Sequence, residues 1–175
     1  MAGATDFESL LLLLARHGVD FVVVGGVAAV LHGAPVNTRD LDIVHARDQR
    51  NLVRLLSALH ELGAVYRNDR RRLQPDESHL ASSGHQLLET RLGDLDLLGS
   101  LGPGIDYASI AVDALDVDLG AARIKLISLD RLIAVKEKLA RPKDQLMLLQ
   151  LRAVKAERAR MLATHEPAAG ADEPD

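Results

Sequence analysis

The stretch FVVVGGVAAVLHGAPVNTRDLDIV, residues 21–44, contains the two segments that decide the fold. Residues 20–24 are short, apolar and rich in β-branched side chains, which is typical of a buried strand. Two glycines then break the run, and VAAVLHG has the length and the terminal glycine of a short helix. After the turn residues APVNT, the segment RDLDIVHA has the composition of a second strand. The stretch therefore predicts a strand, a glycine turn, a short helix and another strand.

Asp40 and Asp42 lie either side of Leu41 in the second predicted strand. Side chains two apart in a strand leave on the same face, with Cα atoms roughly 7 Å apart, while Leu41 and Ile43 point to the other face. Two carboxylates side by side repel, and burial raises the cost of their charge. A divalent cation removes that cost, and Mg²⁺ prefers a few carboxylates together with water and phosphate oxygens. The pair therefore predicts a Mg²⁺ site.

Gly25 and Gly26 lie where the first strand turns into the short helix. Such a turn leaves backbone N–H groups unpaired, and glycine has no Cβ to obstruct a phosphate. The spacing matches neither G-x-G-x-x-G nor the P-loop, which excludes both of those phosphate-binding motifs. Taken alone, a glycine pair is also typical of an ordinary turn. Beside a Mg²⁺ site, however, a phosphate cradle would suit a nucleoside triphosphate.

Composition narrows the setting of this site. The 175 residues fit one domain, and with two Phe, two Tyr and no Trp its core must be aliphatic. The net charge of -4 gives no global basic field, so a nucleic acid would need a local patch. The chain has no cysteine for a disulfide or a thiolate metal site. The N-terminal apolar run LLLLLA is too short to span a membrane and lacks a basic flank, so we expect a cytoplasmic protein with no membrane partner.

The remaining pattern predicts an α/β (α+β) fold, in which helices flank a mixed β-sheet and further helices follow at the C-terminus. Thr5 and Glu8 have capping-box spacing, which predicts a helix over 5–17, and Asp48 would cap another that runs to Leu62. Ser128 and Pro142 would begin the two C-terminal helices. Further strands are predicted at 63–67, 85–90, 93–99, 110–119 and 122–128. We expect a single domain over 1–162, with its core in 18–127, its helical part in 128–162 and a disordered acidic tail over 163–175.

The order of strand, Gly-Gly, short helix and Thr-Arg-Asp-Leu-Asp-Ile resembles the signature of the nucleotidyltransferase superfamily, which has the DNA polymerase β-like fold. That family has a third carboxylate on a later strand, next to the first two. The segment GDLDLLG offers Asp94 and Asp96. Asp96 is flanked by Leu95 and Leu97 as a strand residue should be, whereas Asp94 follows a glycine and is expected in the turn. Asp96 is therefore the predicted third ligand.

A second resemblance lies near the C-terminus. LIAVKEKLARPKDQLMLL, residues 132–149, is similar to the helical motif of small AbiEii-type nucleotidyltransferases. By position, the motif residues are Lys136, Arg141, Lys143 and Asp144. That group includes toxins of bacterial toxin–antitoxin pairs, among them mycobacterial enzymes that add nucleotides to the 3′ end of tRNA. The resemblance therefore implies a toxin with an antitoxin partner as one reading of this chain.

Together these resemblances imply Mg²⁺-dependent transfer of a nucleoside monophosphate from an NTP to a hydroxyl. Asp40 and Asp42 would bind two Mg²⁺ ions, and Asp96 would bind one of them and help to deprotonate the acceptor. Lys136 would neutralise phosphate charge or orient the acceptor, although a solvated helix face is an equally ordinary role for it. The residues implied in nucleotide binding are Gly25, Gly26, Thr38, Arg39, Arg141, Lys143 and Asp144.

The resemblance leaves the acceptor open among tRNA, a protein and a small molecule such as an aminoglycoside-like or lincosamide-like drug. A different class also fits the sequence, namely a non-catalytic module that keeps the fold and binds a nucleotide or a partner protein. The segment RNDRRRL contributes Arg67, Arg70, Arg71 and Arg72, which could contact RNA phosphates. A mobile loop made soluble by its charge is the preferred interpretation of that segment, because acidic residues lie nearby and RNDRRRL itself contains no aromatic residue for base stacking.

Overall fold

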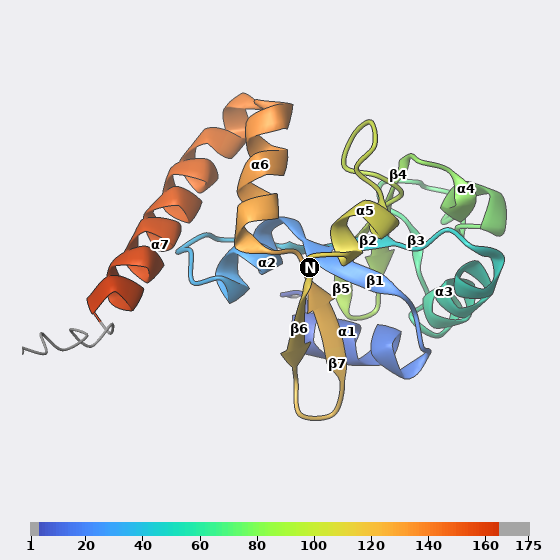
Figure 1. Cartoon of the computed structure of the whole chain (residues 1–175). Coiled ribbons are helices and arrows are strands. Elements are labelled where there is room, and N and C mark those ends of the chain that lie inside the picture. Colours follow the sequence, from blue (N-terminus) through green and yellow to red (C-terminus); the bar gives the residue numbers. More distant parts are fainter. Residues whose placement is uncertain (1–3, 165–175) are drawn as a thin grey trace, which may run out of the picture.

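The computed structural model describes residues 4–164 and shows a mixed seven-stranded sheet with helices around it (Figure 1), which confirms the predicted fold class. The strand order is β3-β4-β5-β2-β1-β7-β6. β1 is antiparallel to β2 and parallel to β7, β2 is parallel to β5, and the pairs at both edges are antiparallel. The strands are β1 (Phe21–Val24), β2 (Asp40–His45), β3 (Val65–Tyr66), β4 (His85–Thr90), β5 (Gly93–Leu98), β6 (Leu115–Asp118) and β7 (Arg123–Leu126).

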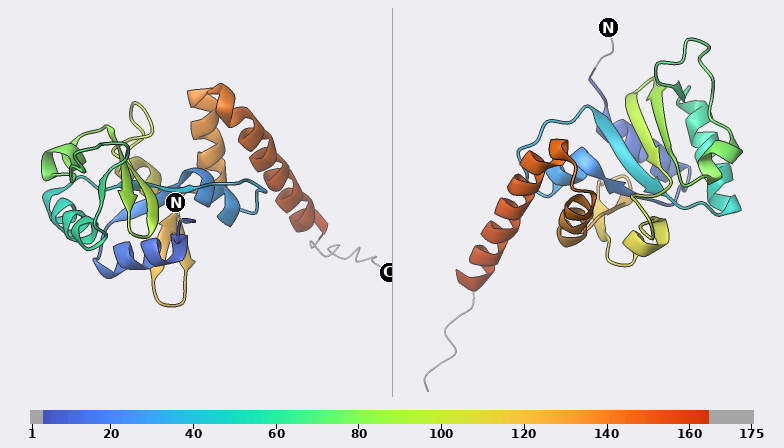
Figure 2. Two further views of the ribbon diagram at one scale, coloured as in Figure 1. Left: turned by 180° about the vertical axis from the view of Figure 1, so that it is seen from behind. Right: turned by 90° about the horizontal axis from the view of Figure 1, so that it is seen from above.

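Two pairs of helices lie at opposite ends of the molecule. α3 and α4 lie beside the β3 edge, whereas α6 and α7 form a helical hairpin at the far end, and Figure 2 shows α7 leaning away from the body. The helices are α1 (Phe7–Arg16), α2 (Gly25–Leu31), α3 (Gln49–Glu61), α4 (Glu77–Ala81), α5 (Tyr107–Ala111), α6 (Leu129–Leu139) and α7 (Gln145–Thr164), with a 3-10 turn, η1 (Pro142–Asp144), before the last. Within residues 4–164, no helix combines the length and the apolar character that crossing a bilayer requires.

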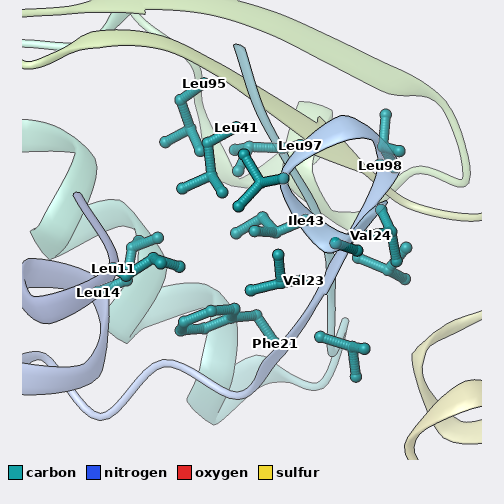
Figure 3. Close-up of a cluster of buried hydrophobic side chains, with 14 of the residues drawn as sticks. Leu11, Leu14, Phe21, Val23, Val24, Leu41, Ile43, Leu95, Leu97 and Leu98 are labelled. Atoms are coloured by element: carbon teal, nitrogen blue, oxygen red, sulfur yellow. The ribbon is translucent and has the colours of Figure 1, made fainter. Parts of the chain in front are cut away.

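The core is built on one face of the central strands. Leu41 and Ile43 of β2 are completely buried, as are Leu95 and Leu97 of β5. Figure 3 shows these four side chains in one cluster with Phe21 and Val23 of β1 and with Leu11 and Leu14 of α1. Because side chains alternate along a strand, the residues between them must face the other side of the sheet. That other side carries the aspartates.

Two of the three predicted helix caps are present. Asp48 accepts a hydrogen bond from the backbone N–H of Asn51 at the start of α3, and Ser128 accepts one from Arg131 at the start of α6. The third prediction was wrong, because Asp6 rather than Thr5 caps α1, accepting from the N–H of Ser9. The Thr5 hydroxyl instead donates to the carbonyl of Arg39 and accepts from the N–H of Asp94. Thr5 thereby joins the beginnings of β2 and β5.

The segment 110–119, predicted as one strand, divides into two elements. Asp106 accepts a hydrogen bond from the N–H of Ser109 and caps α5, which ends at Ala111. β6 then begins only at Leu115. The first residues of this segment therefore belong to a helix, and the last belong to an edge strand. The short helix α4 was also not predicted, and its first residues lie in what was read as a polar loop.

The C-terminal helix continues to Thr164, so residues 163 and 164 of the predicted tail are helical. The rest of that tail, 165–175, lies outside the described residues. Along α7 only Leu151 is fully buried, while Leu146 and Leu149 are largely exposed. The helix is tied to the body by Arg158, whose guanidinium donates to the carbonyl of His32, and by Gln150, which donates to the carbonyl of Pro35.

Candidate active site

Strand register brings the predicted carboxylates together. In the parallel pairing of β2 with β5, Asp40 lies opposite Asp94 and Asp42 lies opposite Asp96. All four side chains therefore share one face of the sheet, opposite the leucine core. On the other side of β2, Val24 pairs with Asp42, so that Gly25 follows directly beside this carboxylate. The sheet thus gathers both halves of the predicted site.

Asp40, Asp42 and Asp96 form a cluster that fits a divalent cation. One carboxylate oxygen from each lies within 4.8 Å of the others, Asp96 is buried, and the other two are partly buried. Oxygen donors of this charge and spacing, with room for water or phosphate, are the ligand set that Mg²⁺ takes. The geometry that the sequence predicted for these three side chains is therefore present.

The pKa values of this cluster show the cost of holding it without a cation. The pKa of Asp42 is raised from 3.8 to about 7, mainly by burial and also by the charges of Asp40 and Asp96. A hydrogen bond from the backbone N–H of Gly26 and the charge of Lys136 act in the opposite direction. Burial also raises the pKa of Asp96 to about 6, against the effect of the nearby Arg67 guanidinium. A bound cation would relieve this repulsion.

Gly25 and Gly26 are needed because the start of α2 lies so close to other side chains of the site. Gly25 has a φ of +65°, and a Cβ there would overlap the Asp42 carboxylate, with Asp42 Cγ only 2.7 Å away. A Cβ on Gly26 would lie 2.5 Å from Thr38 Oγ1. The Gly26 N–H is directed at Asp42. The observed reason for the glycine pair is thus close approach to a carboxylate, and phosphate binding by it stays a prediction.

Thr38 and Arg39 lead into β2 and differ in their surroundings. The Thr38 hydroxyl lies 3.1 Å from the carbonyl and 3.3 Å from a carboxylate oxygen of Asp40, so it borders the cluster. Arg39 is exposed. Both residues, together with Asp94 and the N-terminal residues 4–7, line an open hollow of about 810 Å³. The three clustered carboxylates are not part of its lining.

The C-terminal motif lies at the junction of α6 and α7. Lys136 forms a 2.7 Å ion pair with Asp144, and both side chains are largely buried. The positive charge of Lys136 lowers the pKa of Asp42. Lys136, Arg141 and Asp144 line a shallow hollow of about 480 Å³ that also includes Arg152. Arg141 is exposed, and the side chain of Lys143 lies outside what the structure describes. Lys136 is therefore the motif residue whose charge is tied to the carboxylates.

Two residues of the site were misread in the sequence. Asp94 was expected in a turn, but it lies in β5 and pairs with Asp40, because β5 begins already at Gly93. Arg67 was read as part of a mobile charged loop, but its side chain is three-quarters buried and contacts both Asp94 and Asp96. The sequence did indicate that Arg67 ends the predicted strand 63–67. It did not indicate that this strand lies two places from β5 in the sheet.

The raised pKa of Asp42 predicts a stability that depends on pH. Because the folded-state pKa is above the ordinary value, the ion-free folded state binds a proton that the unfolded state loses, and stability falls as pH rises from 3.8 to about 7. The Asp42→Asn variant should lack this loss, which is about 4 kcal/mol at most over the whole range. Urea unfolding of both proteins in EDTA at pH 5 and pH 8 measures the difference. At pH 8 in EDTA we expect the variant to be more stable relative to the wild type than at pH 5. Added Mg²⁺ should stabilise the wild type and reverse this difference.

Comparisons with known proteins agree with the geometry. The sequence profile of the family described as Aminoglycoside-2''-adenylyltransferase matches residues 7–99, which include the whole carboxylate cluster. No curated protein matches the chain at a significant level. The comparisons do not confirm membership in the AbiEii-type group, to which the C-terminal motif had pointed.

Three solved structures share the fold. The lincosamide antibiotic adenylyltransferase LnuA, bound to lincomycin, has a TM-score of 0.58 and 17% identity over 86% of this chain and 98% of its own. A candidate nucleotidyltransferase from Thermotoga maritima has a TM-score of 0.51 and 19% identity, covering 90% of each chain. An antigenic nucleotidyltransferase-like protein from Paracoccidioides brasiliensis has a TM-score of 0.52 and 14% identity, over 93% of this chain and 90% of its own.

The profile match covers more than half of the chain and includes β1, β2 and β5, the strands that build the site. The solved structures cover 86% and 90% of the chain, which is more than the profile does. The chain therefore belongs to the aminoglycoside-2''-adenylyltransferase family, within the nucleotidyltransferase superfamily.

Proposed function

We propose that the protein transfers a nucleoside monophosphate from an NTP to a hydroxyl of a small-molecule antibiotic. The observation that carries this proposal is the cluster of Asp40, Asp42 and Asp96 on adjacent strands, in a chain of this family. These three carboxylates would hold Mg²⁺. Since NTPs and Mg²⁺ are abundant in the cytoplasm, we propose that location as well.

Each residue of the cluster has a role that follows from its surroundings. Asp96, as the superfamily resemblance implies, would bind one ion and help to deprotonate the acceptor hydroxyl. Asp42, with Asp40, would hold the triphosphate end through the cation. When bound, Mg²⁺ supplies charge stabilisation to the entering and leaving oxygens, and superfamily resemblance suggests two ions. Pyrophosphate would be the leaving group.

Residues around the carboxylates would orient the nucleotide. Lys136 brings a positive charge from α6 toward Asp42 and would neutralise phosphate charge. Arg141 is exposed at the same junction and would contact the nucleotide from solvent. Thr38 and the backbone at Gly25 and Gly26 border the carboxylates on the other side. We propose that the phosphates lie between these two groups.

The comparisons favour an antibiotic acceptor. The family is described by an aminoglycoside adenylyltransferase, and LnuA carries lincomycin in its structure. An RNA acceptor, as in a toxin paired with an antitoxin, remains the second candidate, and it rests on the similarity of residues 132–149 alone. A non-catalytic nucleotide-binding module is the third. The complete carboxylate set supports catalysis over that third reading.

The test is a transfer assay with each of the four NTPs and Mg²⁺, supplied with a panel of aminoglycosides, lincomycin, total RNA or total protein. We expect pyrophosphate release with a drug, and a product whose mass increases by one nucleoside monophosphate. Label in RNA would instead identify the second candidate. Calorimetric binding of Mg·NTP without transfer to any acceptor would favour the module, and no binding of Mg·NTP would refute the proposal.

Lys136 offers a sharper test of the nucleotide's position. Replacing it by glutamine removes a charge opposite the triphosphate, and we expect the KM for the NTP to rise roughly 10-fold or more, as for a lost hydrogen bond to a charged group. Asp144→Asn is the matched control, because it breaks the same ion pair but leaves the lysine in place. Steady-state kinetics at varied NTP separates the two. Equal KM changes in both variants would mean that Lys136 only ties α6 to the η1 turn.

A further inference from the structure

Arg67 lies on the carboxylate face although it comes from the far edge of the sheet. Its backbone N–H donates to the carbonyl of Leu87, and Leu87 pairs with Asp96 in the β4–β5 ladder. This register places residue 67 on the same face as Asp96, two strands away. The long arginine side chain spans β4, where one guanidinium nitrogen also donates to the carbonyl of Leu88.

The guanidinium bridges two of the four carboxylates. Arg67 Nη2 donates to Asp96 Oδ1 at 2.5 Å, and Nε lies 3.4 Å from Asp94 Oδ2. The side chain of Arg67 is 22% exposed and that of Asp96 only 10%, so the pair is largely removed from water. A charged hydrogen bond in such surroundings holds both partners more strongly than one at the surface. Asp96 is thus the predicted metal ligand that already has a fixed cationic partner.

The arrangement leaves Asp96 one occupied oxygen and one available oxygen. Arg67 donates to Oδ1, which leaves the other oxygen of the same carboxylate available to a cation held with Asp40 and Asp42. Arg67 Nε is buried and makes no hydrogen bond, since its approach to Asp94 lacks the required geometry. The guanidinium is therefore held by charge and by the two hydrogen bonds of Nη2, to Asp96 and to the Leu88 carbonyl, rather than by a complete set. Its main anchor is Asp96.

We propose that Arg67 is a positioning residue that orients Asp96 for catalysis and supplies the cluster's counter-charge when no cation is bound. The proposal rests on the proposed function of the same site. Arginine suits both tasks, because a planar guanidinium can contact two carboxylates at once and keeps its charge at any physiological pH. A lysine could supply the charge, but it lacks the planar guanidinium that contacts both carboxylates. Replacing Arg67 by lysine therefore tests the orientation of Asp96 separately from the supply of counter-charge.

The experiment compares the wild type with Arg67→Gln, Arg67→Lys and the control Arg72→Gln. Arg72 comes from the same segment and contacts Glu89 on β4, but it is exposed and its ion pair is long, at 3.6 Å. Two readouts are taken on the full-length protein. The first is the shift in melting temperature caused by Mn²⁺, with Mn²⁺ binding followed by the electron paramagnetic resonance of the free ion. The second is kcat at saturating Mn²⁺, NTP and drug.

We expect the glutamine variant to melt lower than the wild type in EDTA but to gain more from Mn²⁺, because the ion replaces the missing counter-charge. Its Mn²⁺ affinity should equal or exceed that of the wild type, whereas kcat should fall roughly 10- to 100-fold, the usual effect of removing a partner that orients a metal ligand. The lysine variant should respond to Mn²⁺ like the wild type but recover little of kcat. Arg72→Gln should change neither readout.

Three results would overturn the inference. If Mn²⁺ affinity and kcat fell together in the glutamine variant, Arg67 would merely support the fold. If kcat were unchanged, the guanidinium would not orient Asp96. An equal Mn²⁺-induced shift in wild type and variant would show that Arg67 is not the cluster's counter-charge. The Mn²⁺ readouts need no substrate, so a wild type that bound Mn²⁺ but transferred nothing would refute the proposed function and leave the counter-charge testable.

Discussion

Nucleotide transfer by the Asp42→Asn variant is expected to fall by at least roughly 1,000-fold, which corresponds to about 4 kcal/mol of lost transition-state stabilisation. Asp42 lies at the centre of the cluster, between Val24 of β1 and Asp96 of β5 in the strand pairings. Asparagine keeps the size of the side chain but not the charge, so one of the three carboxylates for a cation is lost. The fold should persist, because the ion-free site is strained by this charge rather than held by it.

The assay is pyrophosphate release with the best NTP and acceptor found for the wild type. Asp116→Asn is the control, since Asp116 is an exposed residue of edge strand β6 whose ion pair with Lys125 lies on the surface. Circular dichroism and the urea midpoint in EDTA show whether the fold is retained. A folded Asp42→Asn variant with more than a tenth of wild-type activity would rule out the carboxylate cluster as the catalytic centre.

Gly25→Ala is expected to lower transfer by roughly 100-fold, the effect of displacing a reacting group by about 1 Å. A Cβ at this position would overlap the Asp42 carboxylate, so either Asp42 or the start of α2 must move. The backbone has a φ of +65°, a conformation that costs alanine roughly 1–2 kcal/mol. The substitution therefore combines a backbone cost with a displacement of the metal ligand, although residue 25 itself bears no reactive group.

Gly63→Ala separates these two effects. Gly63 has a similar φ of +60°, but a Cβ there would meet no atom within 4 Å. Both variants should show the backbone cost in urea unfolding, and Gly25→Ala should lose more stability because of the overlap; only Gly25→Ala should lose transfer and Mn²⁺ binding. Equal activity of the two variants would mean that the site tolerates movement of Asp42, and it would contradict the close approach as the reason for this glycine.

The local pattern of the sequence was sufficient for the central part of the fold. Alternation in 40–43 and again in 94–97 predicted which side chains would be buried, and Leu41, Ile43, Leu95 and Leu97 are. The pairing of Asp42 with Asp96 follows the expectation of a third carboxylate beside the first two. These predictions succeeded because strand periodicity and a short motif both act over a few residues.

The parts that failed depend on contacts between distant segments. Thr5 has the spacing of a cap, but its hydroxyl is used between Arg39 and Asp94, which left the cap to Asp6. Arg67 was assigned to a loop because its partners on β5 become visible only once the strand order is known. In both cases a polar side chain had two plausible local roles and took a third, long-range one.

The C-terminal motif did not identify the branch of the superfamily to which the chain belongs. The AbiEii-type resemblance came from residues 132–149, whereas the family profile matches 7–99 and stops before that segment. A lysine followed by a basic and acidic turn is a short pattern on an amphipathic helix, where charges are common for solubility alone. The strand pair and its carboxylates have stricter geometric requirements. The strand pair and its carboxylates identified the superfamily, whereas the helical motif did not identify the branch within it.

Strand β2 carries core residues and candidate catalytic residues at alternate positions. The length of this strand is therefore restricted by the site and by the interior at once. Deleting one residue within Asp40–His45 would exchange the two faces, sending carboxylates into an aliphatic interior and leucine to the substrate. Substitutions can be tried one position at a time, but changes of length in this strand cannot. Relatives that acquire new acceptors should therefore differ in length at the connections, such as the segments before β4 and before α5, while β2 and β5 keep their length.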